Sequence, residues 1–377
     1  MTLPAAPTTQ PASPPLGGKP PEAAPAATPN VISDMPEFQG IDQWLNSQPL
    51  TKAQLKGKVV LVDFWTYSCI NCLRTLPYLK DWYKKYQGKG LVIIGMHSPE
   101  FEFERNPDNV KAAIAQFKIP YPVALDNKMQ MWTAYKNQAW PAHYLIDANG
   151  KIRSIHYGEG DYENTEATIQ KLLMERTYKK PETQPSAESQ PAAETQPVKK
   201  GKRGKKSVLP ATPPAKTSEE SQPVQMPPLT MMPPNVDFSQ IKTPETYMGF
   251  LRRERLVTSG RPLESNEWMY DGKWRTEGER IFLVEGMGKI QFRFSATKVN
   301  VVMGPESSGG APISAVVLLD GQPVPKEKAG KDVQGAGLLI TEPRMYELIN
   351  LGDKGEEHTI EIQFLAPGVG VYSFTFG

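Results

Sequence analysis

The chain has 377 residues, which is enough for two ordinary domains and the segments that connect them. Its formal net charge of +2 is close to balance and gives no argument for nucleic acid as a partner. No apolar run approaches the ~20 residues that span a bilayer, and the first residues show neither the charged nor the apolar region of a secretory signal.

Two segments are too poor in large apolar side chains to fold. Residues 1–35 are rich in Ala, Pro and Thr, and residues 179–235 are rich in Pro, Gln, Glu, Ser and Thr. Burial cannot offset the entropy lost on ordering such segments, so we expect a disordered tether and a disordered linker. The linker carries a basic cluster, Lys199–Lys206. We interpret it as a solvated charged patch, and contact with an anionic surface is the alternative. Two folded domains remain, 36–178 and 236–377.

The first domain alternates strands and helices. Apolar runs predict strands at 59–62, 91–96 and 121–125, and an Asn149-Gly150 turn predicts a hairpin of two further strands at about 142–147 and 151–157. Helices are predicted directly after Cys69, from Asn106 or Asp108 to about Phe117, at 129–135 and at about 164–178. This order predicts an α/β fold with a central mixed sheet and helices on both faces.

The second domain has a different pattern. Short alternating apolar runs are separated by Gly, Pro and Asp-Gly turns, which predicts an all-β sandwich with one short helix around 245–255. Trp268, Tyr270 and Trp274 lie close together near its start. Such aromatic residues are more often part of a core, and a platform for a ligand is the alternative.

Two cysteines separated by two residues stand where the first predicted strand meets a helix. Cys69 and Cys72 are the only cysteines, and Cys69 lies where unpaired N–H groups and the helix dipole favour a thiolate. A zinc site normally takes four ligands, and the four histidines are scattered without ligand spacing. The sequence therefore predicts a redox pair, with no metal and no cofactor.

The surroundings of this pair resemble the thioredoxin superfamily. Three residues lie between Val62-Asp63-Phe64-Trp65 and Cys69. Pro77 follows Cys69 in a helix that the proline is expected to kink. Trp140-Pro141 matches the superfamily's cis-proline position. The extra segment between the second and third strands is similar to the TlpA-like branch. The resemblance implies a thioredoxin-like fold for the first domain.

A more specific resemblance is to DipZ-type proteins. It is carried by WTYSCINCLRTLPYL, HSPEFEFE and WPAHYLIDANGKIRSIHYGEGDY, and more weakly by TPETY and GVYSFTFG in the second domain. In that family a membrane electron-transfer domain precedes a thioredoxin-like domain and a jelly-roll-like β-sandwich similar to carbohydrate-binding modules. The resemblance implies a periplasmic or cell-envelope location, protein clients with disulfides or dithiols, a membrane electron donor of the DipZ or CcdA type, and a glycan as a candidate ligand of the second domain.

The resemblance also implies residue roles. Cys69 is expected to attack, Cys72 to resolve the mixed disulfide, and Asp63 to accept the proton of Cys72. Pro141 is expected to leave a backbone edge open to a substrate peptide. Trp65 and Trp140 are expected to shape the rim of the site, and packing in the core explains them equally well. These roles predict a thiol-disulfide oxidoreductase. Cytochrome c maturation and redox homeostasis are the candidate processes in which it would act.

Two other functions remain open. Thiol peroxidases resemble P-x-x-x-T-x-x-C, in which Thr66 fits but Val62 stands in the place of the proline. The second alternative is a binding module for a glycan or a cell-surface protein, in which the redox domain is accessory.

Overall fold

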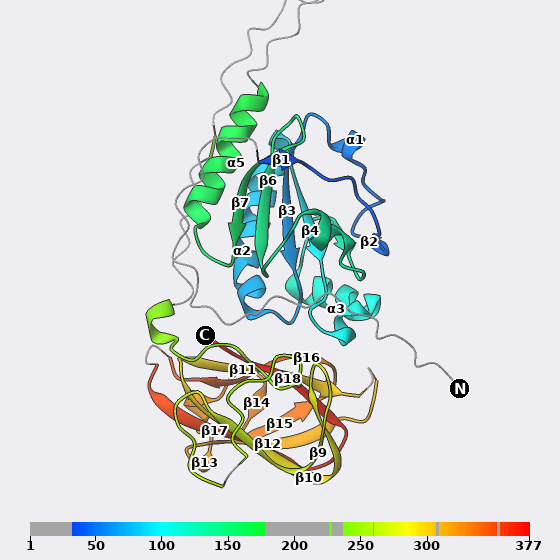
Figure 1. Ribbon diagram of the computed structural model, residues 1–377. Helices are drawn as coiled ribbons and strands as arrows, with labels where there is room; N and C mark the ends of the chain where they lie inside the picture. The colour runs from blue at the N-terminus through cyan, green and yellow to red at the C-terminus, as the bar shows by residue number, and fades with distance from the viewer. Residues whose placement is uncertain (1–31, 178–225, 228–236, 259, 307–308, 353–354) are drawn as a thin grey trace, which may run out of the picture.

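The computed structural model describes residues 32–177, 226–227, 237–258, 260–306, 309–352 and 355–377. Nearly all of the predicted tether and linker, including the basic cluster, lies outside the described residues. The described residues form an α/β domain and an all-β domain, and the two lie against each other (Figure 1).

The first domain is built on a mixed sheet. Its strands are β1 (Ser33–Asp34), β2 (Gln43–Leu45), β3 (Val59–Trp65), β4 (Leu91–His97), β5 (Val123–Leu125), β6 (Ala142–Ile146) and β7 (Lys151–Tyr157). They are ordered β1-β7-β6-β3-β4-β5-β2, with β3, β4 and β5 parallel and the other pairs antiparallel. Every residue of β3 is buried, because helices cover both faces of the sheet.

The helices are α1 (Lys52–Leu55), α2 (Ile70–Tyr86), α3 (Pro107–Phe117), α4 (Gln130–Ala134) and α5 (Tyr162–Thr177), with 3₁₀ turns η1 (Gln87–Lys89) and η2 (Glu102–Arg105). Alternate residues of a strand face opposite sides, so Leu61 packs with α2, α3 and α5, whereas Val62 packs with α1 and α4. The predicted α/β fold with helices on both faces is confirmed.

Three short elements were not expected from the sequence. β1 lies inside the predicted tether and pairs with β7. Met35, the residue after β1, is buried. β2 and α1 precede the central strand, and both are too short for a periodic signal. Pro77 lies inside α2, whose helical assignment continues through it.

The second domain contains only antiparallel strand pairs among its named strands. These are β8 (Thr246–Tyr247), β9 (Trp268–Thr276), β10 (Ile281–Ser295), β11 (Lys298–Pro305), β12 (Ile313–Leu319), β13 (Gln322–Pro323), β14 (Val333–Gln334), β15 (Gly337–Ile340), β16 (Arg344–Asn350), β17 (Glu357–Phe364) and β18 (Val369–Phe376). The main path runs β14-β15-β12-β17-β10-β18-β11-β16, with β13, β8 and β9 attached to it. The all-β prediction is confirmed, and the sheet curls into a nearly barrel-shaped domain (Figure 1).

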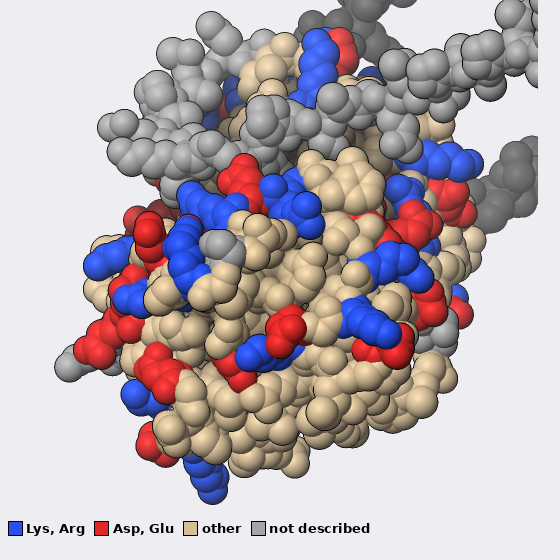
Figure 2. All heavy atoms as spheres, turned by 60° about the horizontal axis from the view of Figure 1, so that its bottom comes forward, with Lys and Arg blue, Asp and Glu red and all other residues tan. Residues whose placement is uncertain are grey.

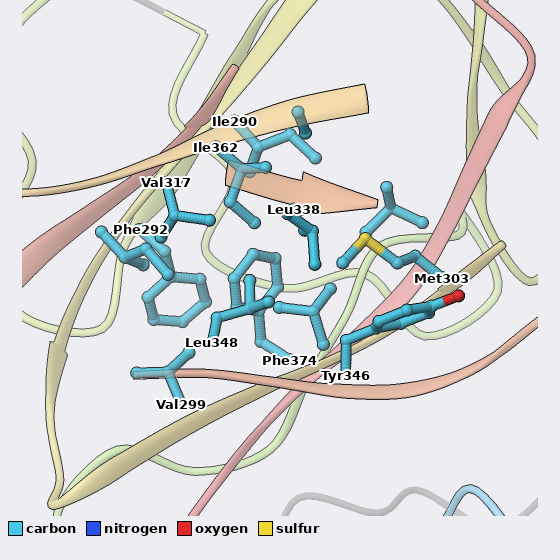
Figure 3. Packing of buried hydrophobic residues seen from close by; sticks show 14 of the residues in the cluster. Ile290, Phe292, Val299, Met303, Val317, Leu338, Tyr346, Leu348, Ile362 and Phe374 are labelled. Atoms are coloured by element: carbon cyan, nitrogen blue, oxygen red, sulfur yellow. The ribbon is translucent and has the colours of Figure 1, made fainter. Parts of the chain in front are cut away.

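One core fills this β-domain. Side chains from strands far apart in the sequence meet inside it, among them Phe292, Val299, Ile362 and Phe374 (Figure 3). On the outside, Lys and Arg are interspersed with Asp and Glu (Figure 2). Pairs such as Lys273 with Glu285 are exposed and contribute at most about 1 kcal/mol each.

The helix predicted around 245–255 is wrong. Met248 donates its N–H to the carbonyl of Tyr372, and β8 pairs with β18, so the segment begins as a short strand and continues in turns. η3 (Phe238–Gln240) and η4 (Lys326–Lys328) are the helical turns of the described β-domain. Trp268 is fully buried and Trp274 packs on Phe364, which favours the core interpretation of the aromatic trio.

Candidate active site

The two cysteines lie at the N-terminal end of α2. Cys69 is the N-cap residue, and its Sγ accepts the N–H of Cys72 at 3.3 Å. Cys69 is half-buried and Cys72 is completely buried, and both thiols are free. The strand β3 ends four residues before Cys69, so the predicted delivery of the pair from a strand to a helix start is confirmed.

Asp63 lies in the interior of the first domain, on the same face of the sheet as α2. It is completely buried, and its Oδ1 is 3.3 Å from Nε2 of His143, which is also buried. The side chain of Cys72 belongs to the cluster packed on this face. Burial raises the pKa of the Cys72 thiol well above its ordinary value, and the hydrogen bond and charge of Cys69 and the charge of Asp63 add to this effect.

Pro141 and Trp140 lie at the end of the sheet where β3 enters the cysteine loop. The Trp140–Pro141 bond is cis, and Ala142 pairs with Phe64 directly after it. Trp140 is half-buried, donates Nε1–H to the carbonyl of Ser98 at 2.9 Å, and packs on Trp132 with ring centroids 4.1 Å apart. This places Trp140 at a partly open position.

Trp65 does not lie at the rim. Its side chain is 1 % exposed and packs edge-on against His97 in the core. Trp65 follows Asp63 by two residues, and the period of two in a strand directs both side chains to the buried face covered by α2. Of the two interpretations of Trp65, the structure favours packing in the core over a place at the rim.

The pKa of Cys69 also differs from the expectation. Burial raises the pKa of the Cys69 thiol above its ordinary value, and the charges of Glu245 and Glu100 act in the same direction. Hydrogen bonds from Cys72 act in the opposite direction. The helix N-terminus was expected to favour the thiolate, but the β-domain covers this end of α2 and supplies the acidic Glu245.

The cover is an apolar contact between the two domains. Phe101 packs with Tyr247, Val302, Met345 and Tyr372 of the β-domain. Ile70 and Leu73 of α2 and Phe103 are partly buried against this interdomain cluster. The residue next to Cys69 therefore contacts the β-domain.

Polar contacts border the interdomain cluster. Glu100 accepts hydrogen bonds from Arg252 and from the hydroxyl of Tyr247, each at 2.7 Å. The guanidinium of Arg252 lies 3.6 Å from the centre of the Tyr247 ring, which adds a cation–π contact. Glu100 is 7 % exposed and Arg252 is 23 % exposed, so the ion pair is largely shielded from solvent.

A second buried acid links the cysteine loop to this interface. Glu104 is completely buried and accepts hydrogen bonds from Ser68 Oγ at 2.5 Å and from the N–H groups of Glu100 at 2.6 Å and Phe101 at 3.0 Å. Burial, helped by the charge of Glu100, raises the pKa of Glu104 to about 7. Glu104 was not predicted as a site residue. Its only sequence signal is that it alternates with Phe101 and Phe103 in HSPEFEFE.

A cleft of about 580 Å³ opens between the domains, beside Ile70, the residue that follows Cys69. Ile70 and Arg74 of α2 line one side, and residues of the β-domain that include Lys298, Asn300 and Glu347 line the other. Arg74 is held by Glu159 at 2.8 Å and by Asn71 at 2.7 Å. An extended segment bound in this cleft would pass the residue that follows Cys69.

The described residues contain no group of three or more His, Cys, Asp and Glu side chains that could hold a metal ion. In the same residues, no helix is long and apolar enough to cross a membrane.

Comparisons with known proteins agree with this geometry. Residues 31–155 match the model of the AhpC/TSA family, and residues 243–377 match the model described as thioredoxin like C-terminal domain. Protein DipZ of Mycobacterium tuberculosis is 31 % identical over 357 residues, which cover 91 % of this chain and 42 % of DipZ. The chain thus spans less than half the length of that relative.

Two further comparisons concern the first domain alone. The thiol-disulfide oxidoreductase YkuV of Bacillus subtilis is 31 % identical over 142 residues, which cover 37 % of this chain and 95 % of YkuV. A solved structure of a putative thiol:disulfide interchange protein DsbE from Chlorobium tepidum is 25 % identical, with a TM-score of 0.34, and covers 39 % of this chain and 99 % of that one. The chain belongs to the thioredoxin-like thiol-disulfide oxidoreductases, and it has the DipZ-like combination of a thioredoxin-like domain with a second, β-rich domain.

Proposed function

We propose that this protein exchanges disulfides with protein clients in the cell envelope, with Cys69 as the attacking thiol and Cys72 as the resolving thiol. The observation that carries the proposal is the geometry of the pair at the start of α2. Cys69 is half-buried, and its Sγ accepts the N–H of the completely buried Cys72 at 3.3 Å. A partly open thiol can reach a client, whereas a buried neighbour can attack only the first sulfur.

The reducing reaction has two steps. The Cys69 thiolate attacks one sulfur of the client disulfide, a mixed disulfide forms, and the second client sulfur leaves as a thiolate that takes a proton from water. Cys72 then gives its proton to Asp63, and the Cys72 thiolate attacks Cys69 Sγ. The Cys69–Cys72 bond forms as the mixed disulfide breaks, so the protein loses two electrons and the client gains them. Oxidation of a client dithiol is the same sequence in reverse.

The interdomain cleft supports a place for the client chain. It begins at Ile70 and Arg74, directly after Cys69, and its opposite wall belongs to the β-domain. Trp140 and the cis peptide at Pro141 lie at the strand ends on the same side as the cysteine loop. We assign substrate contact to Trp140 and Pro141 and proton transfer to Asp63.

The test uses the full chain and a peptide that contains one disulfide. The wild-type protein should reduce or form this disulfide, Cys69→Ser should abolish the exchange, and Cys72→Ser should accumulate the mixed disulfide. A double Cys69→Ser, Cys72→Ser variant that retains the exchange would refute the proposal. The reduction potential of the pair then gives the direction, since a value near ~ −270 mV favours a reductase and one near ~ −120 mV an oxidant.

The location and the electron donor are assigned through DipZ. The match to this protein covers 91 % of the chain and both domains. We therefore place the protein in the periplasm or cell envelope, with a membrane electron donor of the DipZ or CcdA type. Cytochrome c maturation and redox homeostasis are the processes that such a donor would serve. Fractionation of cells that express the native gene tests the location.

A thiol peroxidase is the second candidate, because residues 31–155 match the AhpC/TSA family and Thr66 precedes Cys69 by three residues. In that reaction Cys69 attacks a peroxide, water or an alcohol leaves, and Cys72 condenses with the sulfenic acid to release water. Faster consumption of hydrogen peroxide than of a peptide disulfide would favour this reading. A glycan ligand for the β-domain receives less support, because Trp268 and Trp274 pack on its core.

A further inference from the structure

A row of three ionisable side chains crosses the sheet beneath the cysteines. Asp63 on β3 lies directly opposite His143 on β6, and His143 lies directly opposite His156 on β7. Residues that face each other across antiparallel strands point to the same side of the sheet, with Cβ atoms about 5 Å apart. The three side chains therefore form a continuous line from the interior toward the edge of the domain.

The contacts within this row leave two nitrogens available. Nε2 of His143 is 3.3 Å from Oδ1 of Asp63, which is ion-pair range without hydrogen-bond alignment. The rings of His143 and His156 are stacked at 19°, with centroids 6.1 Å apart. His156 makes a hydrogen bond to the backbone of Glu159, and its Nε2 is buried. Neither Nδ1 of His143 nor Nε2 of His156 has a hydrogen-bond partner among the described residues.

The row begins at the resolving thiol and ends near solvent. Cys72 packs on the face of the sheet that carries Leu61 and Trp65, and the period of two in a strand directs Asp63 to this same face. Cys72 and Asp63 are both completely buried. His143 is 1 % exposed, whereas His156 is half-buried and lies next to the loop that leads to Glu159 and Asp161. Cys72 itself is completely buried, so a proton that it releases must pass through a neighbouring group to reach water.

We propose that His143 and His156 relay the Cys72 proton between Asp63 and solvent. The inference rests on the proposed roles of Cys72 and Asp63. During resolution Cys72 gives its proton to Asp63, which passes it to Nε2 of His143. Nδ1 of His143 releases a proton through one water molecule to Nε2 of His156, and Nδ1 of His156 releases one to bulk water. No electrons move along the row, and the same path supplies a proton when the Cys69–Cys72 disulfide is reduced.

Other titratable groups face the row. Tyr121 lies near Asp63 and Cys72, and burial raises the pKa of its hydroxyl so far that it keeps its proton. Burial lowers the pKa of His156, His143 acts in the same direction, and Asp161 and the backbone of Glu159 act in the opposite one. These shifts disfavour a proton that stays on His156, so the ring would pass its proton on. Arg74 pairs with Glu159 at the outer end of the row.

The test separates the two chemical steps by rapid mixing of the reduced full-length protein with a peptide disulfide. Attack is measured in the Cys72→Ser background as the rate of mixed-disulfide formation. Resolution is measured with both cysteines present, by acid quenching and alkylation, between pH 6 and 8. His143→Gln, His143→Leu and His156→Gln are compared with His358→Gln, which changes a histidine that pairs with Asp320 on the β-domain.

We expect each His143 variant to slow resolution by about tenfold, which is less than the roughly 10²–10⁴-fold rate contribution typical of acid–base groups. The rate of attack should change by less than twofold. His156→Gln should slow resolution less, and added imidazole should restore its rate, because a small buffer can replace a half-buried relay group but not a structural contact. His358→Gln should behave as wild type. If His143→Leu fails to fold, His156→Gln with imidazole still decides the question.

Two results would overturn the relay. In the first, the rate of resolution stays within twofold of wild type in His156→Gln and in every His143 variant that folds. In the second, the variants slow attack and resolution equally. Such a result with an active wild-type protein leaves the proposed function intact. A wild-type protein that forms no mixed disulfide would refute the proposed function, and the relay with it.

Discussion

Glu104 makes the stability of the first domain depend on pH in a way that can be calculated. The carboxyl group is completely buried, and its pKa is raised from 4.5 to about 7 mainly by burial. The folded state therefore binds the proton more tightly than the unfolded state does. The contribution of Glu104 to the free energy of unfolding is fully present below pH 4.5 and falls as the pH rises toward 7. Since one pKa unit corresponds to about 1.4 kcal/mol, the loss between pH 4 and pH 8 is about 3 kcal/mol.

The perturbation that tests this value is Glu104→Gln, which keeps the size of the side chain and cannot ionise. Relative to wild type, the free energy of unfolding of Glu104→Gln should rise by about 3 kcal/mol between pH 4 and pH 8. The assay is urea unfolding of the reduced protein, followed by tryptophan fluorescence at the two pH values. Taking the difference from wild type cancels the other groups that titrate in this range.

Glu102→Gln is the matched control, because Glu102 lies in the same 3₁₀ turn and its side chain is 77 % exposed. It should leave the difference between pH 4 and pH 8 unchanged. If Glu104→Gln keeps the pH dependence of wild type, the buried carboxyl does not gain its proton on folding, and the reasoning about Glu104 is refuted.

Two further predictions concern the interface and the second core. Arg252→Ala removes the partner of Glu100 and should speed the alkylation of Cys69 by iodoacetamide at pH 8. The rate should rise by about tenfold for each 1.4 kcal/mol of stability that the interface loses. An unchanged rate would show that the β-domain does not shield the thiol. Phe292→Ala deletes a completely buried ring and should lower the free energy of unfolding of the β-domain by about 3–5 kcal/mol, measured by urea unfolding, and a loss below 1 kcal/mol would contradict the packing.

Much of the first domain follows from local sequence patterns. The apolar, β-branched run at 59–62 predicts a buried strand, and the spacing of Cys69 and Cys72 at a helix start is visible without coordinates. The direction of Trp65 could have been derived as well, because residues 63 and 65 share one face of a strand.

Other features of the site depend on contacts between distant segments. The row of Asp63, His143 and His156 requires the register of three strands, which the sequence does not specify locally. The cover over Cys69 depends on how Phe101 meets Tyr372, two residues 271 positions apart by number. No periodicity of either segment contains that information, so the raised pKa of Cys69 could not be foreseen.

The short segment from Phe101 to Arg105 contacts both the cysteine loop and the β-domain. On one side Glu104 holds Ser68, the residue before Cys69, and on the other Phe101 and Phe103 pack on Tyr372. A change in how the β-domain packs on Phe101 and Phe103 would therefore reach Ser68, and with it Cys69, through this one segment.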